Sequence, residues 1–94
     1  PIEIENVLNA HPNVAESAAV EMLVKADTTV IAAFYVPSGE VEHAELERFA
    51  AEKLAKYKCP RIYRQVAALP KGANGKLLRR QLRDAHKMAA ISKS

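Results

Sequence analysis

One lysine, Lys76, ends a short segment whose composition favours a tight, exposed turn. Residues 69–76 read Leu-Pro-Lys-Gly-Ala-Asn-Gly-Lys. Gly72, Asn74 and Gly75 allow the positive φ angles of a sharp loop, so we expect this loop to position the lysine. An ammonium group presented there can neutralise negative charge on a molecule outside its own domain. The alternative is a turn followed by a surface helix, with Lys76 solvated as most lysines are.

The same segment does not match a nucleotide-binding phosphate loop. Only two residues separate Gly72 from Gly75, whereas the G-x-x-x-x-G-K-[ST] pattern needs four. Leu77 also stands where that pattern places the hydroxyl that binds a metal ion. The segment is therefore not a phosphate loop of this kind.

Metal binding and thiol catalysis are not indicated either. The three histidines and Cys59 lack the close pair spacing of zinc sites, so we expect no metal and place each histidine at the surface. Cys59 sits beside Lys58 and Arg61, but no His–Asp arrangement accompanies it. We interpret Cys59 as a structural or incidental thiol.

Charge is unevenly distributed along the chain. Residues 1–50 carry two basic and nine acidic side chains, whereas residues 51–94 carry twelve basic and two acidic ones. This asymmetry favours a phosphate-bearing or otherwise anionic partner for the second half, or a solvated basic helix face. A nucleic-acid surface has the charge in its favour but lacks interleaved aromatic residues, since only Tyr57 and Tyr63 are near.

Bulk composition bounds the protein class. Ninety-four residues form one domain with one modest core, and 49% of them are apolar. A single cysteine fits a reducing compartment, and no apolar run is long enough to span a membrane, so we expect a cytoplasmic protein. The chain opens at Pro1 without an initiator methionine, which suggests a piece of a longer protein.

The first half predicts a helix followed by a β-hairpin. Pro1 suits a first helical position, and Ile4, Val7 and Leu8 give residues 1–10 an amphipathic pattern that Pro12 closes. Residues 14–24 and 29–36 read as two antiparallel strands. The second is β-branched and aromatic, which predicts a central strand buried on both faces.

The second half predicts a helix, a strand, the lysine loop and a last helix. The helix spans residues 43–56 without an obvious N-cap, and Arg61–Val66 reads as a third strand. The apolar face of this helix, which we expect to pack in the core, comprises Leu46, Phe49, Ala50, Leu54 and Tyr57. The last helix places Leu78, Leu82 and Ala85 inward and Arg79, Arg80 and Arg83 mostly on its other faces, and the tail after Lys87 is expected to fray. The fold class is α+β: a small sheet, made of a β-hairpin plus a third strand, flanked by about three helices.

Three stretches together resemble the C-terminal lid domain of the adenylate-forming superfamily. This superfamily comprises acyl- and aryl-CoA synthetases, peptide-synthetase adenylation domains and luciferases. Residues 1–14, PIEIENVLNAHPNV, are similar to its P-x-E-I-E…L…H-P-x-V opening, and residues 54–60, LAKYKCP, to L-x-x-Y-K-x-P. Residues 69–79, LPKGANGKLLR, are similar to L-P-[KR]-T-x-[NS]-G-K-[IL]-x-R, with Gly72 in place of the usual threonine.

The resemblance implies a two-step acid–thiol ligase. Such enzymes adenylate a carboxylic acid with ATP and Mg²⁺ and then pass the acyl group to a thiol, commonly that of coenzyme A. It implies that a large N-terminal domain, absent from this chain, holds the nucleotide, the metal ion and the acid. The small domain rotates between two poses, and in the first the motif lysine, matched by Lys76, reaches the carboxylate and α-phosphate oxygens.

The resemblance also implies two further roles. Tyr57, Lys58 and Arg61 match a cluster that holds the coenzyme A nucleotide in some aryl-CoA ligases, with Cys59 where a basic residue often sits. The alternative for Tyr57 is a place on the apolar face of the helix at residues 43–56. In many bacterial members acylation of the motif lysine switches the enzyme off, which would make a lysine acyltransferase and a deacylase partners at Lys76. Two other functions stay open: a small basic module for RNA or another polyanion, and the lid of a peptide-synthetase adenylation domain.

Overall fold

The computed structural model describes the backbone of residues 2–92 and the side chains of residues 2–85. Its elements are α1 (Ile2–Asn9), β1 (Val14–Lys25), β2 (Thr28–Pro37), α2 (His43–Lys53), the 3-10 helix η1 (Lys56–Lys58), β3 (Ile62–Gln65) and α3 (Arg79–Ser92). The expected place of Pro1 as the first helical residue lies outside the described residues. The predicted order of helices and strands is confirmed, with boundaries shifted by a few residues.

The three strands form one mixed sheet with β2 in the centre. β1 and β2 pair as the predicted antiparallel hairpin, in a register that sets Ala19 opposite Ala33. β3 runs parallel to β2 on the other side, with Tyr63 opposite Ala33. α2 lies on the crossover that returns the chain to the same end of the sheet, as a parallel pairing requires. The predicted α+β class is therefore confirmed.

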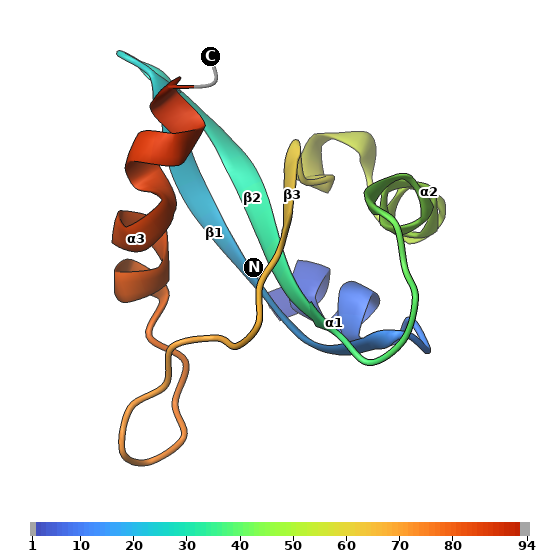
Figure 1. Ribbon diagram of the computed structural model, residues 1–94. Coiled ribbons are helices and arrows are strands. Elements are labelled where there is room, and N and C mark those ends of the chain that lie inside the picture. The colour runs from blue at the N-terminus through green and yellow to red at the C-terminus, as the bar shows by residue number, and fades with distance from the viewer. Residues whose placement is uncertain (1, 93–94) are drawn as a thin grey trace.

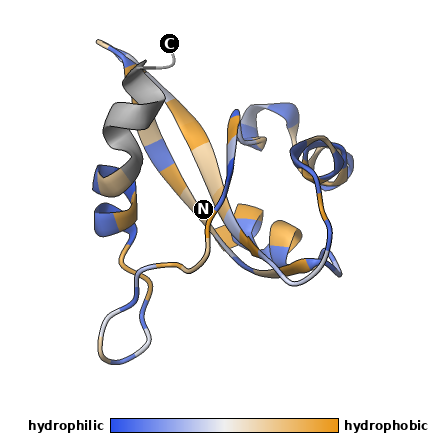
Figure 2. Ribbon diagram, viewed as in Figure 1, coloured by the Kyte–Doolittle hydropathy of each residue, from blue (hydrophilic) through white to orange (hydrophobic). Residues whose placement is uncertain are grey.

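Helices cover both faces of this sheet (Figure 1). α1 and α2 pack on one face, where the buried residues are Ile4, Leu8, Val14, Ala19, Ala33, Tyr35, Leu46, Ala50, Leu54 and Tyr63. α3 covers the other, where they are Ala18, Val20, Met22, Ala32, Phe34, Leu69 and Leu82. Hydrophobic residues follow the strands and α1, as Figure 2 shows. Alternate β2 residues thus bury into opposite cores, which confirms the central strand buried on both faces.

α2 ends three residues before the prediction placed its end. Leu54 already has extended angles, φ −117° and ψ 148°, and the chain turns through η1. Because the helical periodicity stops at Lys53, Tyr57 does not continue the apolar stripe; it is 80% exposed. The alternative that Tyr57 completes the core was wrong, and Phe49 is only half-buried. The expected weak start is confirmed, because Glu42 makes no side-chain cap.

The last helix also differs from its prediction. It begins at Arg79, so Leu78 lies before it and is partly exposed, and of the three residues expected to face inward only Leu82 is buried. The helix continues to Ser92, although fraying was expected after Lys87. Leu82 on α3 therefore packs in the same core as two leucines of the loop, Leu69 and Leu77.

His11 is not the surface residue that the sequence suggested. It is 5% exposed, its Nε2 lies 2.6 Å from Oε2 of Glu45, and its Nδ1 accepts the N–H of Asn13 at 3.0 Å. The ring also makes an edge contact with Phe49. Since Nδ1 accepts a hydrogen bond, the proton of the neutral ring sits on Nε2 and points at the carboxylate. His11 thus fastens the turn after α1 to α2.

Candidate functional site

The lysine loop is a small hairpin with a defined turn. Lys71 and Leu77 form an antiparallel bridge, and the Gly72 N–H donates to the Lys76 carbonyl at 2.8 Å. The Gly75 N–H closes the turn onto the Gly72 carbonyl at 2.9 Å, and Gly75 takes φ +80°. A turn followed by a left-handed glycine is a common three-residue hairpin connection, and glycine adopts it without strain.

The side chain of Asn74 steadies the residue that follows the turn. Its Oδ1 accepts the backbone N–H of Lys76 at 3.1 Å, which is a local Asx-type bond. Of the three residues expected to allow a positive φ, only Gly75 adopts one, while Gly72 and Asn74 contribute hydrogen bonds to the backbone of Lys76. Lys76 itself is exposed.

The hairpin projects away from the body of the domain (Figure 1). Among residues 2–85, whose side chains are described, the ammonium group of Lys76 has no hydrogen-bond or ion-pair partner. Hydrophilic residues alternate with neutral ones around the loop (Figure 2). A lysine held on a projecting hairpin without a partner of its own is available to an anion from another domain or molecule.

Two contacts join the base of the hairpin to the sheet. The Lys71 ammonium lies 2.7 Å from Oε1 of Glu16 on β1, and the Leu78 N–H donates to the Pro70 carbonyl at 2.9 Å. Leu69 is buried beneath α3. The tip of the loop is thus exposed while its two ends are fixed.

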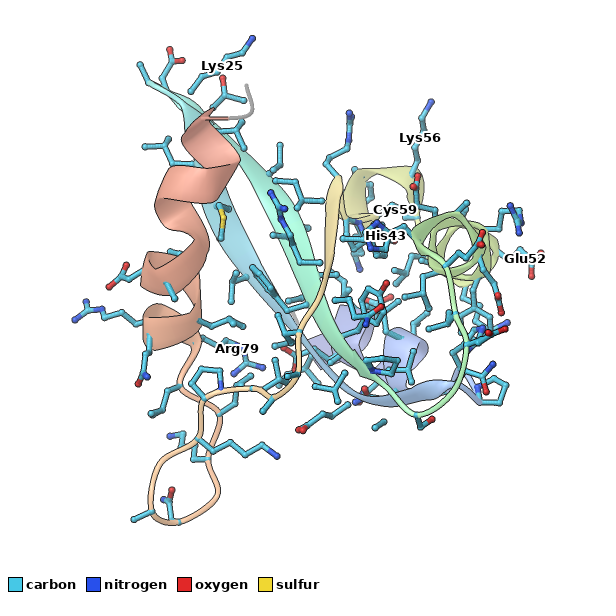
Figure 3. The ribbon with its side chains drawn as sticks, in the orientation of Figure 1. Lys25, His43, Glu52, Lys56, Cys59 and Arg79 are labelled. Carbon is cyan, nitrogen blue, oxygen red and sulfur yellow. The ribbon has the colours of Figure 1, made fainter. Side chains whose placement is uncertain are left out.

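A third contact lies where the loop enters α3. The Nη2 of Arg79 donates to both carboxylate oxygens of Glu5, at 2.6 and 2.7 Å. Arg79 points toward the body of the domain rather than into solvent (Figure 3). The expectation that Arg79 lies on a solvated face of the last helix was therefore wrong. Glu5 is a residue that sequence reasoning missed, because no local pattern marks a partner so far away in the chain.

Three ion pairs join the acidic first half of the chain to its basic second half. Lys58 pairs with Glu3, Lys71 with Glu16 and Arg79 with Glu5, so each pair joins a cation of the second half to a carboxylate of the first. The folded chain brings its oppositely charged halves together. These three pairs neutralise part of the charge of the basic second half, which weakens the charge argument for a polyanion-binding face.

Two of the three residues expected to bind coenzyme A share a groove. It has a volume of about 570 Å³ and lies on the α1 side of the sheet, between the hairpin end and the turn after α2. Tyr57, Cys59 and Arg61 line it together with Ile4, Ala19, Val20, Glu21 and Thr28–Ile31. An exposed aromatic ring and an exposed guanidinium group at the edge of an apolar groove can bind a planar ring and a phosphate.

Lys58 lies beside this groove but is held by another residue. Its Nζ lies 2.7 Å from Oε1 of Glu3 and 5.7 Å from the centre of the Tyr57 ring. The hydrogen bond and charge of Glu3, and to a smaller extent Tyr57, raise the pKa of Lys58. Lys58 must leave Glu3, or share its ammonium, before it can contact a ligand. The Cys59 thiol, half-buried, donates weakly to the Ala55 carbonyl.

The core on this side contains two tyrosines without hydrogen bonds. The hydroxyl groups of Tyr35 and Tyr63 are buried and have no partner among the described residues. Burial raises the pKa of both, and that of Tyr63 reaches about 12 with smaller contributions from Cys59 and Glu47. Both therefore stay neutral over the physiological range.

Among the described residues, no group of three or more His, Cys, Asp or Glu side chains is placed to hold a metal ion. No described helix has both the length and the apolar character to cross a membrane.

Comparisons with known proteins agree with this geometry. The family model for the AMP-binding enzyme C-terminal domain matches residues 3–76. The 2-succinylbenzoate–CoA ligase of Bacillus mycoides is 48% identical over 83 residues, which is 88% of this chain and 17% of that protein. The Bacillus cereus (strain Q1) enzyme of the same name is 49% identical over the same lengths. The chain thus spans about one sixth of the curated relatives that it matches.

Solved structures give the same result. The fatty acyl CoA synthetase of Mycobacterium tuberculosis superposes with a TM-score of 0.89 at 29% identity, covering 95% of this chain and 18% of that one. The unliganded O-succinylbenzoate coenzyme A synthetase of Bacillus subtilis superposes with a TM-score of 0.78 at 41% identity, covering 90% and 17%. With a family model matching most of its length, this chain belongs to the AMP-binding enzyme C-terminal domain family.

Proposed function

We propose that this chain is the mobile C-terminal lid of an ATP-dependent acid–CoA ligase and that Lys76 is its catalytic lysine. The observation that carries the proposal is the presentation of Lys76: it is exposed, it ends a projecting hairpin, and its ammonium group has no partner among the described residues. A solvated surface lysine needs no such support from a three-residue turn, an Asx-type bond and an anchored base. The names of the relatives support the acid–CoA class.

In the first half-reaction Lys76 would bring its ammonium to the carboxylate and the α-phosphate of ATP. Negative charge accumulates on the phosphorus oxygens as the carboxylate attacks and pyrophosphate leaves. A preorganised cation in a site closed to water stabilises that charge more than it stabilises the ground state. The fixed hairpin sets where the Lys76 backbone lies, so only the side chain has to be ordered when the ammonium meets its target.

In the second half-reaction the groove face would meet coenzyme A. Tyr57 offers an exposed ring for the adenine, and Arg61 offers a cation for a phosphate. Lys58 would join them by exchanging Glu3 for the ligand. The lysine hairpin and the groove belong to different parts of the domain, which suits a lid that turns between two poses.

The rest of the ligase belongs to the proposal as well. The nucleotide, Mg²⁺ and acid would be held by an N-terminal domain, since no described cluster in this chain suits a metal ion. The relatives named as CoA ligases favour coenzyme A over a peptide-synthetase carrier protein as the acceptor. We place the ligase in the cytoplasm, which the free thiol of Cys59 supports.

Exposure of Lys76 also supports control by acylation. A lysine acyltransferase would remove the positive charge and add bulk at the hairpin, and a deacylase would restore it. The modified residue would then resemble Lys76→Ala in the adenylation step.

The test is to measure the two half-reactions separately in the complete ligase. Lys76→Ala should slow adenylation by about 10²- to 10³-fold, the scale for losing one preorganised charge stabiliser. Thioester formation from supplied acyl-adenylate should change little. Lys56→Ala is the matched control, because Lys56 is an exposed lysine on η1 away from the hairpin (Figure 3). Equal loss in both half-reactions would contradict the proposed role.

A further inference from the structure

We propose that Glu5 is a positioning residue for Lys76 and acts through Arg79. This inference rests on the proposed function, because it assumes that the ammonium of Lys76 must reach a fixed place. Glu5 lies on α1, far from the hairpin tip, and contacts no part of the loop itself. Its effect would be to set where the chain leaves the hairpin.

The inference is supported by the contacts of Glu5, which join α1 to α3 around the edge of the sheet. α1 and α3 lie on opposite faces, and β1 is the edge strand between them. Oε2 of Glu5 accepts the N–H of Ala19 on β1 at 2.8 Å, while both of its oxygens accept from Arg79. The carboxylate therefore caps an edge-strand donor and holds the first residue of α3 at once. The side chain of Glu5 is 12% exposed and that of Arg79 38%, so the carboxylate is shielded from water while the guanidinium group is partly open to it.

Lys76 depends on this bridge because of its place in the chain. It stands three residues before Arg79, and Leu77 and Leu78 between them are bound to the other side of the hairpin. The opposite end is held by buried Leu69 and by the pair of Lys71 and Glu16, which is more exposed than that of Arg79 and Glu5. If Arg79 were released, the hairpin would lose the anchor at its α3 end, so its internal hydrogen bonds would open more often and Lys76 would shift. Displacement of about 1 Å at a reacting group can cost roughly a hundredfold in rate.

A purely structural role for the pair makes a different prediction. Loss of fold stability would lower both half-reactions together, in proportion to the unfolded fraction, and would loosen the whole sheet. A positioning role lowers adenylation alone and loosens the hairpin first. The two can be separated in one set of variants.

The experiment uses the complete ligase with Glu5→Gln and Arg79→Gln. Glutamine keeps an oxygen for the Ala19 N–H while removing the charge that holds Arg79, so the sheet edge stays capped. Glu52→Gln on α2 and Arg80→Gln, next to Arg79, are matched controls because both side chains are exposed. Hydrogen exchange is followed at the Gly72, Gly75 and Leu78 amides, which are bonded within the hairpin, and at the buried β2 amides.

The expected result is faster exchange at the hairpin amides in both variants, with β2 unchanged. Adenylation should slow by about 10- to 100-fold, mainly in kcat, while thioester formation from supplied acyl-adenylate is unaffected. Arg79→Lys, which keeps a cation near Glu5, should recover most of the loss. The two controls should behave like the unmodified ligase in every measurement.

Unchanged hairpin exchange in Arg79→Gln would overturn the inference, and so would an equal loss in both half-reactions. These outcomes are distinct from failure of the proposed function, which would appear as normal adenylation by Lys76→Ala. In that case the adenylation rates of the Glu5 and Arg79 variants would no longer report on the position of Lys76. The exchange at Gly72 and Gly75 would still decide whether the bridge holds the hairpin.

Discussion

Glu5 and Arg79 stand 74 positions apart in the chain and meet at 2.6 Å. The pair joins α1 to the first residue of α3 and passes around the edge of β1, where Glu5 also accepts the Ala19 N–H. It therefore links the first and last of the three segments that carry the family resemblance. The lysine hairpin lies directly before this link.

We expect Glu5 and Arg79 to be energetically coupled in the isolated 94-residue chain. Removing Arg79 leaves the shielded Glu5 carboxylate unpaired, and removing the Glu5 charge leaves the partly exposed Arg79 without its partner. Each single variant should therefore be destabilising, and the double variant Glu5→Gln/Arg79→Gln less so than their sum. A coupling of about 1–3 kcal/mol is expected from groups in direct contact. Denaturant unfolding of the four proteins measures it. Simple additivity within about 0.5 kcal/mol would show that the pair contributes no mutual stabilisation.

Much of the fold follows from local patterns. The run of β-branched and aromatic residues in β2 predicted a strand buried on both faces, and alternate burial of Ala32, Ala33 and Phe34 confirms it. Helix ends were harder to place. Nothing in the local periodicity showed that Leu54 turns extended, and that turn alone moves Tyr57 from the core to the surface.

In the candidate site, too, the features set by neighbouring residues were predictable and those set by distant contacts were not. The glycines and Asn74 predicted the lysine loop, because turn geometry is encoded within a few residues. The partner of Arg79 was not predictable, since a contact between α1 and α3 depends on the whole sheet lying between them. His11 was misplaced for a similar reason: its burial is completed by Glu45 and Phe49 on α2. Polar residues buried by long-range contacts give no periodic signal.

Gly75 is expected to be the less replaceable of the two loop glycines. At φ +80° any other residue except asparagine or aspartate pays about 1–2 kcal/mol, so Gly75→Ala should destabilise the hairpin although its Cβ would meet no atom within 4 Å. Gly72→Ala is the control, because its φ is not positive and its nearest contact, Asn74 Oδ1, is at 3.4 Å. Hydrogen exchange at the Lys76 amide reports the difference. Equal protection in both variants would contradict it.

His11→Ala should destabilise the isolated chain by about 2–4 kcal/mol. The variant removes a buried ring, leaves a cavity beside Phe49 and deprives the Asn13 N–H of its acceptor. His43→Ala is the matched control, because His43 is exposed and its ring only touches the edge of Tyr35. Thermal unfolding should rank the two variants clearly. A smaller loss in His11→Ala than in His43→Ala would show that the bond to Glu45 does not hold the turn.

Tyr63 should make stability fall at alkaline pH. Its pKa is raised from 10.0 to about 12 in the folded chain, first by burial, so the folded state retains a proton that the unfolded state has lost. The stabilisation is fully present below pH 10 and is lost as the pH rises toward 12. Urea unfolding at a series of pH values measures this slope.

Tyr63→Phe supplies the comparison. Since the Tyr63 hydroxyl has no partner among the described residues, the variant should be about as stable as the parent at neutral pH and more stable above pH 10. Tyr57→Phe, at an exposed position, should leave the slope unchanged. A parallel alkaline decline in the parent and Tyr63→Phe would assign the effect to other groups.

The last prediction concerns the groove face. In the complete ligase, Arg61→Ala should raise the KM for coenzyme A by roughly ten- to a hundredfold, the effect of one charge-assisted hydrogen bond of about 1.5–3 kcal/mol. Tyr57→Ala should raise it as well, because stacking of a base on an aromatic ring is worth about 1–3 kcal/mol. Adenylation should stay intact in both, since neither residue lies near the lysine hairpin.

Two comparisons make this test decisive. Lys56→Ala removes an exposed cation that does not line the groove, so its KM for coenzyme A should match that of the parent. RNA binding by the isolated chain, measured over a range of salt concentrations, tests the polyanion reading, which requires an affinity that falls steeply with salt. Because Lys58, Lys71 and Arg79 are each paired with a carboxylate, we expect weak binding. Tight, salt-sensitive RNA binding together with an unchanged KM in Arg61→Ala would favour the polyanion module over the ligase lid.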